Sequence, residues 1–135
     1  MNAIEFDESR FPLVVVTYRG IASTVEFEAF LARIGGWLAK GRSYALVFDC
    51  SSAAVPSALQ RRRFAEWTAS HRGDLERLCV GKAFVITSPL IHGALTAVVW
   101  LQQLPYPHQV VATRKAAEAW CRGQLGARHS SGQPA

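Results

Sequence analysis

The stretch from Tyr44 to Ser52 (YALVFDCSS) constrains the fold of this chain more than any other segment. Its first five residues are apolar or aromatic and can cover both faces of a sheet, as in a buried parallel strand. Asp49 and the two serines prefer water or a loop, and Pro56-Ser57 then precedes a predicted helix. Open α/β folds place binding surfaces where a parallel strand runs through a polar loop into a helix. The stretch therefore predicts an α/β fold and locates a functional surface without naming its chemistry.

Hydrophobic periodicity predicts the element order ββαβαβαβα. We expect strands at Ile4–Phe6, Leu13–Tyr18, Tyr44–Phe48, Val80–Thr87 and Gln109–Ala112, and helices at about 23–40, 57–70, 88–104 and 113–125. The short turn between the first two strands indicates an antiparallel hairpin, whereas each later strand-helix-strand unit favours parallel pairing. The predicted fold is a single-domain α/β structure over residues 1–125, with a mixed, mostly parallel sheet and helices mainly on one side. The small and polar segment Gly126–Ala135 is predicted to be a disordered tail.

The composition narrows the class of protein. A length of 135 residues suits one domain, and a content of 50% apolar and 19% charged residues excludes an intrinsically disordered chain. The apolar runs Pro12–Thr17 and Gly93–Leu101 are shorter than the roughly 20 residues that span a bilayer. The N-terminal residues are acidic, whereas a signal peptide begins with a basic segment. We therefore expect a cytoplasmic protein without a membrane span.

The sequence predicts no metal site, no cofactor and no catalytic centre. The cysteines Cys50, Cys79 and Cys121 are far apart and form no CxxC pair, and the four histidines are scattered, so a zinc site is not expected. The motifs GxSxG, GxGxxG and GxxxxGK[ST] are absent from the sequence. Cys79 and Cys121 fit a core, whereas Cys50 stands at a predicted strand end where its thiol would be accessible.

Five residues near the end of the third strand are candidates for binding a partner or an anion: Asp49, Ser51, Ser52, Ser57 and Arg61. The serines either bind an anion or accept phosphate at a helix start, where free amides favour negative charge, or they only cap and turn the chain. The acid is either a ligand group or a partner for loop amides. The arginine either binds an acidic partner, with which the net charge of +5 is compatible, or covers the edge of the core. Nucleic acid is not an expected partner, because the aromatic residues fit core positions.

The segment from Pro89 to Leu104 is apolar nearly all round, which exceeds the one-sided stripe of a surface helix. One interpretation is a helix fully covered by the sheet and its neighbours. The alternatives are an exposed face that forms a homodimer or contacts lipid, and an apolar pocket beneath the helix. The sequence leaves these interpretations open.

The element order, with a strand that ends in Asp49 before the second helix, resembles the STAS superfamily, and more specifically the stand-alone SpoIIAA-like bacterial proteins. The resemblance extends from about Ile4 to Leu125. The positions that carry it are Gly20 after the second strand, Phe48-Asp49, Ala83-Phe84-Val85-Ile86 and the segment Ala117–Trp120. The superfamily includes anti-sigma-factor antagonists and the cytoplasmic domains of sulfate transporters. The resemblance implies a non-enzymatic regulatory or binding domain.

The phosphorylation site of the antagonists does not carry over to this chain. In those proteins an Asp-Ser-Ser-Gly motif follows the strand, and a partner kinase phosphorylates its serine. The matching stretch here is Ser57-Ala58-Leu59-Gln60, which lacks the acid, the glycine and the phosphorylated serine. The resemblance therefore implies a regulatory module that binds a protein partner at the start of the second helix. The alternative function is a carrier of a small apolar or anionic ligand, held in a pocket between the third predicted helix and the sheet.

Overall fold

The computed structural model describes residues 3–102 and 104–130 of the chain. Within these residues, five strands form one sheet in the order β1-β2-β3-β4-β5. Their bounds are β1 Ile4–Arg10, β2 Leu13–Gly20, β3 Tyr44–Ala53, β4 Cys79–Val85 and β5 His108–Val111. β1 pairs with β2 in antiparallel register, and all other neighbours pair in parallel. The predicted mixed, mostly parallel sheet is thus confirmed.

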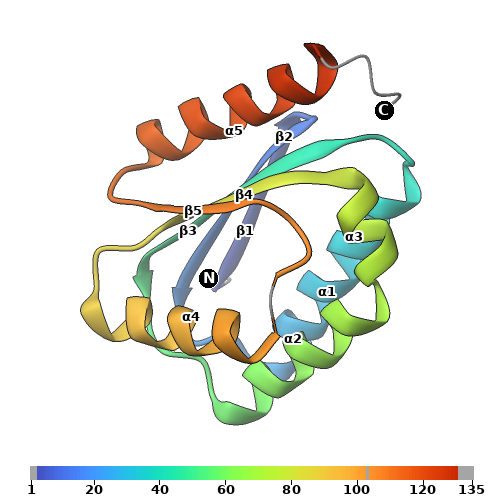
Figure 1. Cartoon of the computed structure of the whole chain (residues 1–135). Helices are drawn as coiled ribbons and strands as arrows, with labels where there is room; N and C mark the ends of the chain where they lie inside the picture. Colours follow the sequence, from blue (N-terminus) through green and yellow to red (C-terminus); the bar gives the residue numbers. More distant parts are fainter. Residues whose placement is uncertain (1–2, 103, 131–135) are drawn as a thin grey trace.

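In the described part of the chain, five helices cover this sheet on two faces. Their bounds are α1 Thr24–Ala39, α2 Ala58–Ser70, α3 Arg72–Leu78, α4 Pro89–Gln102 and α5 Arg114–Ser130. Figure 1 shows α1, α2, α3 and α4 on one side of the sheet and α5 alone on the other. The prediction of helices mainly on one side is therefore confirmed. The physical reason is that successive right-handed crossovers between neighbouring parallel strands place their helices on the same face of the sheet.

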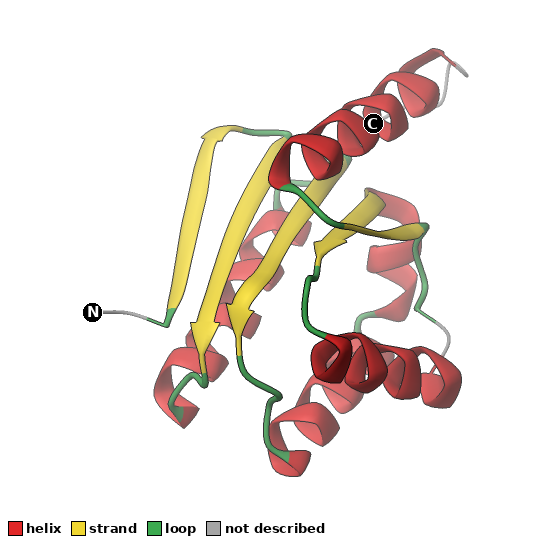
Figure 2. Ribbon diagram, turned by 90° about the vertical axis from the view of Figure 1, so that its left-hand side faces the viewer, coloured by secondary structure: helices red, strands yellow, loops and turns green. Residues whose placement is uncertain are grey.

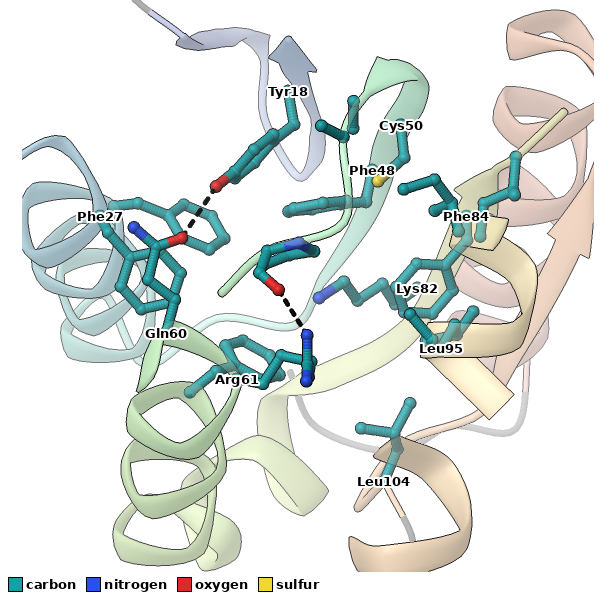
Figure 3. Close-up of a pocket in the computed structure, with 18 residues that line it drawn as sticks. Tyr18, Phe27, Phe48, Cys50, Gln60, Arg61, Lys82, Phe84, Leu95 and Leu104 are labelled. Atoms are coloured by element: carbon teal, nitrogen blue, oxygen red, sulfur yellow. Dashed lines mark hydrogen bonds between the residues drawn. The ribbon is translucent and has the colours of Figure 1, made fainter. Parts of the chain in front are cut away.

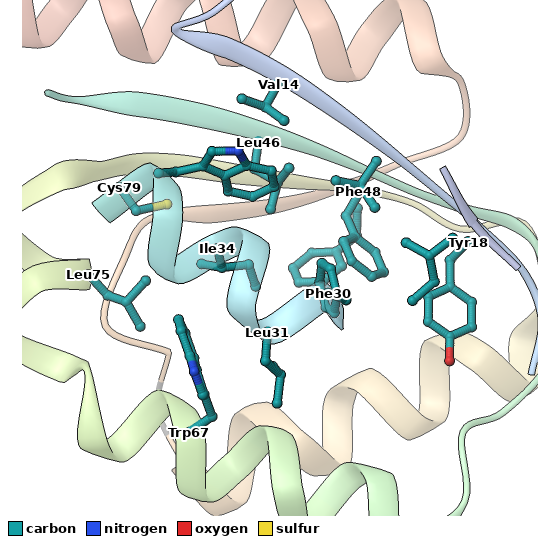
Figure 4. Packing of buried hydrophobic residues seen from close by; sticks show 14 of the residues in the cluster. Val14, Tyr18, Phe30, Leu31, Ile34, Leu46, Phe48, Trp67, Leu75 and Cys79 are labelled. Atoms are coloured by element: carbon teal, nitrogen blue, oxygen red, sulfur yellow. The ribbon is translucent and has the colours of Figure 1, made fainter. Parts of the chain in front are cut away.

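The larger core lies between the sheet and the four helices (Figure 4). Phe30 of α1 packs against Phe48 of β3 with ring centroids 5.6 Å apart, and Trp37 packs against Tyr44 at 5.7 Å. Helical spacing predicts that Trp37 lies on the apolar face of this helix, and it is 1% exposed, with its indole nitrogen donating a hydrogen bond to Glu8. Helical spacing also predicts burial of Trp100, whose side chain lies outside those that the structure describes.

Three boundaries differ from the sequence-based expectation. β3 continues through Asp49 to Ala53, because this part of the strand still pairs with β2. The register of the pairing shifts between Thr17 and Arg19 of β2. A separate helix, α3, follows α2 directly, whereas the sequence predicts no helix between residue 70 and the fourth strand. α5 runs to Ser130, five residues beyond the predicted end at Leu125, and Arg128 donates a hydrogen bond to the carbonyl of Arg77. The remainder of the predicted tail, residues 131–135, lies outside the described residues.

Side-chain alternation along the strands decides which face each candidate residue serves. Phe48 and Cys50 of β3 belong to the core under the four helices, whereas Val47 belongs to the smaller core beneath α5. In β4, Phe84 faces the four helices and Ala83 faces α5. Neighbouring residues of one strand therefore contribute to two separate regions of the molecule.

Candidate functional site

The side chain of Asp49 lies on the face of the sheet that α5 covers, and it is 10% exposed. One carboxylate oxygen accepts hydrogen bonds from the backbone and the hydroxyl of Ser51, at 3.0 and 2.7 Å. The other accepts two bonds from the guanidinium of Arg114 at the start of α5, the shorter being 2.9 Å. Burial by itself would raise the pKa of Asp49, but these hydrogen bonds outweigh it and hold that pKa below its usual value. The acid thus joins β3 to α5, and its oxygens are occupied by protein donors.

The other two candidate serines differ in their surroundings. Ser57 is the N-cap of α2, and its hydroxyl accepts a hydrogen bond from the backbone N–H of Gln60 at 3.1 Å. This arrangement is the capping alternative of the sequence analysis. Ser52 is exposed near the C-terminal end of β3, where it pairs with Arg19 of β2.

Arg61 lies one turn into α2, half-buried, and its guanidinium donates a hydrogen bond to the carbonyl of Pro56. Arg61 and Ser57 lie on the side of the sheet that the four helices cover. Asp49 and Ser51 are hydrogen-bonded to each other on the side that faces α5. The structure therefore splits the predicted cluster into two groups, one on each face of the sheet. The reason is that Asp49 continues a strand and alternates with the pocket-facing Phe48 instead of entering a loop.

The carboxyl ends of the parallel strands form an edge with exposed apolar residues, which we call the carboxyl edge. Four large hydrophobic side chains are highly exposed among the described residues: Ile21 at 57%, Val25 at 80%, Leu59 at 72% and Leu90 at 76%. Each stands in the loop or first helical turn that follows β2, β3 or β4. Figure 2 shows the chain leaving these strands toward one end of the molecule, where α1, α2 and α4 begin.

A cavity of about 130 Å³ opens between the sheet and the helices α2 and α4 (Figure 3). Most of its wall is aromatic or aliphatic, including Phe27, Phe48, Phe84 and Leu95. The wall contains few polar groups: the Tyr18 hydroxyl, the Gln60 amide, the Cys50 thiol, the Arg61 guanidinium and the Lys82 amine. Helix α4 thus covers an apolar pocket, one of the alternatives raised by its composition.

Lys82 is the most unusual residue of this cavity, because its side chain projects from the middle of β4 and is only 4% exposed. Its ammonium lies over the rings of Phe48, Phe84, Phe64 and Tyr106, at 4.5, 4.9, 5.0 and 5.9 Å from their centroids. Figure 3 shows its nitrogen pointing into the space between α2 and the sheet. Desolvation lowers the pKa of Lys82 to about 8, which leaves the amine mostly charged at neutral pH.

The thiol of Cys50, expected to be accessible, is instead buried in the same wall. Burial raises its pKa to about 12, so the nucleophilic thiolate is not populated at neutral pH. The expectation was wrong because Cys50 does not end the strand: β3 continues to Ala53 and keeps the side chain under the helices.

Sequence reasoning missed Lys82 and Arg114. The signal for Lys82 was a single charged residue within an apolar segment that reads VGKAFVI. Such a residue is buried or exposed depending on neighbours that local sequence does not reveal. The signal for Arg114 was weaker still, since a basic residue in the first turn of a helix opposes the helix dipole and needs an acidic partner.

Comparison with solved structures identifies proteins of the same architecture. The unphosphorylated anti-sigma factor antagonist SpoIIAA matches with a TM-score of 0.65 at 16% identity, covering 90% of this chain and 99% of its own. The chain has a SpoIIAA-like fold. A DUF3478-family protein of SpoIIAA-like fold from Shewanella loihica matches with a TM-score of 0.65 at 14% identity, covering 88% of this chain and 92% of its own. An anti-sigma factor antagonist from Mycobacterium paratuberculosis matches at 0.52 and 18% identity, with the same two coverages of 88% and 92%.

At these identities the SpoIIAA-like neighbours establish the fold of the chain. No protein-family model matches the sequence, and no curated protein matches it. Within residues 3–102 and 104–130, no three His, Cys, Asp or Glu side chains gather where they could hold a metal ion. None of the helices in that part of the chain has both the length and the apolar character to cross a membrane.

Proposed function

We propose that this SpoIIAA-like protein is a non-enzymatic, cytoplasmic regulatory module that binds a protein partner at the carboxyl edge. The observation that carries this proposal is the placement of Ile21, Val25, Leu59 and Leu90, which are exposed and all begin or precede helices at that edge. Exposed apolar residues that gather in one region favour a protein interface over a purely solvated surface. The exposed Arg62 on α2 adds positive charge beside Leu59, so the expected partner offers apolar side chains within an acidic rim.

Constitutive binding is expected, without control by phosphate at the second helix. Leu59 and Ala58 occupy the stretch that matches the phosphorylated motif of the resembling antagonists, and neither accepts a phosphate. Regulation by phosphate would have to use Ser51, Ser52 or Ser57. Phosphoproteomics of the protein from its native host tests this point, and stoichiometric phosphate at any of the three serines would contradict constitutive binding.

The test of the partner surface compares two variants of the intact chain. Leu59→Asp places a charge on the carboxyl edge, and Ala119→Asp places the same charge on the exposed face of α5, on the opposite side of the sheet. Both positions are exposed, so each change should alter the free energy of unfolding by less than about 0.5 kcal/mol. Proteins that co-purify with wild type from the native host are identified by mass spectrometry, and their affinities are then measured with recombinant material.

The partner should retain its affinity for Ala119→Asp and lose about tenfold or more for Leu59→Asp, as expected for an apolar contact inside an interface. A partner that binds both folded variants as tightly as wild type would refute the carboxyl edge as the binding surface.

A second function, carriage of a small ligand, is favoured by a different observation. The cavity beneath α4 has an apolar wall and a few convergent polar groups, which is the usual constitution of a small-molecule site. The described residues that line it include no histidine and no carboxylate, the residue types that most often act in general acid–base catalysis. This supports binding, rather than chemistry, as the role of the cavity.

A further inference from the structure

We propose that the cavity beneath α4 binds the carboxylate of a small apolar acid and that the Lys82 ammonium is the group that holds it. The inference rests on the carrier function given above and adds the chemical class of the ligand. It is independent of the protein-binding surface at the carboxyl edge.

The first argument is the missing counterion. Within the described residues, the Lys82 ammonium has aromatic rings as neighbours but no hydrogen-bond acceptor and no carboxylate. A buried ammonium is strongly unfavourable unless it is paired, and cation–π contacts recover only part of the lost hydration. A ligand that brings an anionic acceptor into the cavity would supply the pairing that the protein does not.

The second argument is the sign of the charge around the cavity. Arg61 on α2 lines the same space as Lys82 on β4, and no acidic side chain is among the described lining residues. Two cations that share one apolar enclosure repel each other and attract an anion. Because the Arg61 guanidinium is already bonded to the Pro56 carbonyl, Lys82 is the cation whose donors are free for a ligand.

The third argument is size and polarity. A volume of about 130 Å³ is close to that of engineered apolar cavities that accept a benzene ring. A phosphate group carries more charge and needs several donors, whereas the cavity wall offers one free ammonium. A monocarboxylate with a short alkyl or aryl body matches both the single cation and the apolar wall formed by Phe27, Phe84 and Leu95.

Binding of an anion should be coupled to proton uptake by Lys82. The pKa of its amine lies at about 8, so roughly half of the molecules carry the charge at pH 8, and a bound carboxylate favours the charged form. The other titratable or charged groups that line the space around it, from β2, β3, β4, α2 and the segment before β5, are Tyr18, Tyr44, Cys50, Cys79, Arg61 and Tyr106. Burial raises the pKa values of the three tyrosines and both thiols, so these groups stay neutral at pH 8.

The experiment compares octanoate with 1-octanol, which share an alkyl chain and differ in charge. Isothermal titration calorimetry at pH 7 is performed on wild type, on Lys82→Met and on Lys115→Met, which removes the same charge from the exposed face of α5. Octanoate should bind wild type and Lys115→Met about tenfold or more tightly than octanol, because a charge-assisted pair in a desolvated site adds at least that much. Lys82→Met should lose this preference and keep its affinity for octanol within about twofold.

A second readout distinguishes recognition of the carboxylate from a general change of shape. At pH 8, titrations in two buffers of different ionisation enthalpy should show uptake of up to about half a proton per octanoate by wild type and none by Lys82→Met. Equal binding of octanol and octanoate by wild type would overturn the inference and leave the carrier function standing. Binding of neither probe would overturn both, and an unchanged octanoate preference in folded Lys82→Met would overturn the role of the lysine.

Discussion

Replacing Lys82 by methionine should stabilise the protein at neutral pH, although it removes a residue from the middle of a strand. The side chain is 4% exposed and its ammonium is surrounded by aromatic rings. Methionine has a similar length, fills the same space and needs no counterion. The unfavourable burial of the charge disappears with the ammonium, as in proteins where apolar residues replace buried ionic groups.

The size of the effect follows from the displaced pKa. The pKa of Lys82 is about 8 in the folded protein against 10.5 for an ordinary lysine, and this difference corresponds to roughly 3 kcal/mol of destabilisation below pH 8. The nearby rings offset part of it, at about 0.5 to 2 kcal/mol for a cation–π contact. Lys82→Met should therefore raise the free energy of unfolding at pH 7 by about 1–3 kcal/mol.

The sign of the pH dependence is the sharper expectation. Because the folded pKa is lowered, the unfolded chain binds more protons than the folded one between pH 8 and pH 10.5. The lysine's contribution to the stability of wild type therefore rises with pH across this window and is most unfavourable below pH 8. The advantage of Lys82→Met should shrink from pH 7 to pH 10.

Urea denaturation at pH 7, 8, 9 and 10, followed by tryptophan fluorescence, measures this difference, with Lys115→Met as the control for loss of an exposed charge. The control should track wild type at every pH. A gap between Lys82→Met and wild type that stays constant within about 0.5 kcal/mol from pH 7 to pH 10 would refute desolvation of the lysine. A methionine variant less stable than wild type at pH 7 would show that the aromatic contacts outweigh the cost of burial.

Three further predictions concern the two cores and the connection between them. Asp49→Ala leaves the Arg114 guanidinium without its carboxylate, and urea denaturation should show a free energy of unfolding lower by about 2–4 kcal/mol at pH 7. The loss should be smaller near pH 3, because an acid whose pKa is lowered stabilises the fold only while it is ionised. Gly81→Ala places a Cβ 2.8 Å from the Trp120 ring and should cost about 1–3 kcal/mol, which thermal unfolding would detect; an unchanged melting temperature would mean that α5 moves freely. Trp37→Ala should cost about 3–5 kcal/mol in urea denaturation, and a cost below about 1 kcal/mol would contradict its burial.

Sequence periodicity was sufficient for the architecture because each element carries its own local signal. The five apolar residues from Tyr44 to Phe48 predict a strand buried on both faces, and all five are buried in the sheet. Capping chemistry is equally local: the Ser23 hydroxyl accepts a hydrogen bond from the Glu26 backbone at 3.1 Å, as its capping-box spacing predicts. These interactions join residues within a few positions of each other, so the sequence alone determines them.

Boundaries and faces depended on neighbours distant in the chain. Asp49 has the local character of a loop residue, yet pairing with β2 and the Arg114 guanidinium, 65 residues away, keep it in the strand. Side chains of β3 alternate between the two faces of the sheet, which places Asp49 on the face opposite Arg61. Because both faces are buried, the sequence of β3 shows no alternation of apolar and polar residues from which this could be predicted.

Lys82 illustrates the same limit most clearly. Its position in a strand could be predicted from the apolar residues on either side, but its burial could not, because a lysine at a strand position is usually exposed. The rings that enclose its ammonium come from β3, α2, β4 and the segment before β5. The sequence by itself determined the strands, the helices and their order. Only the packing of four segments around one amine decided that this lysine is buried, because desolvation depends on everything that surrounds a charge in space.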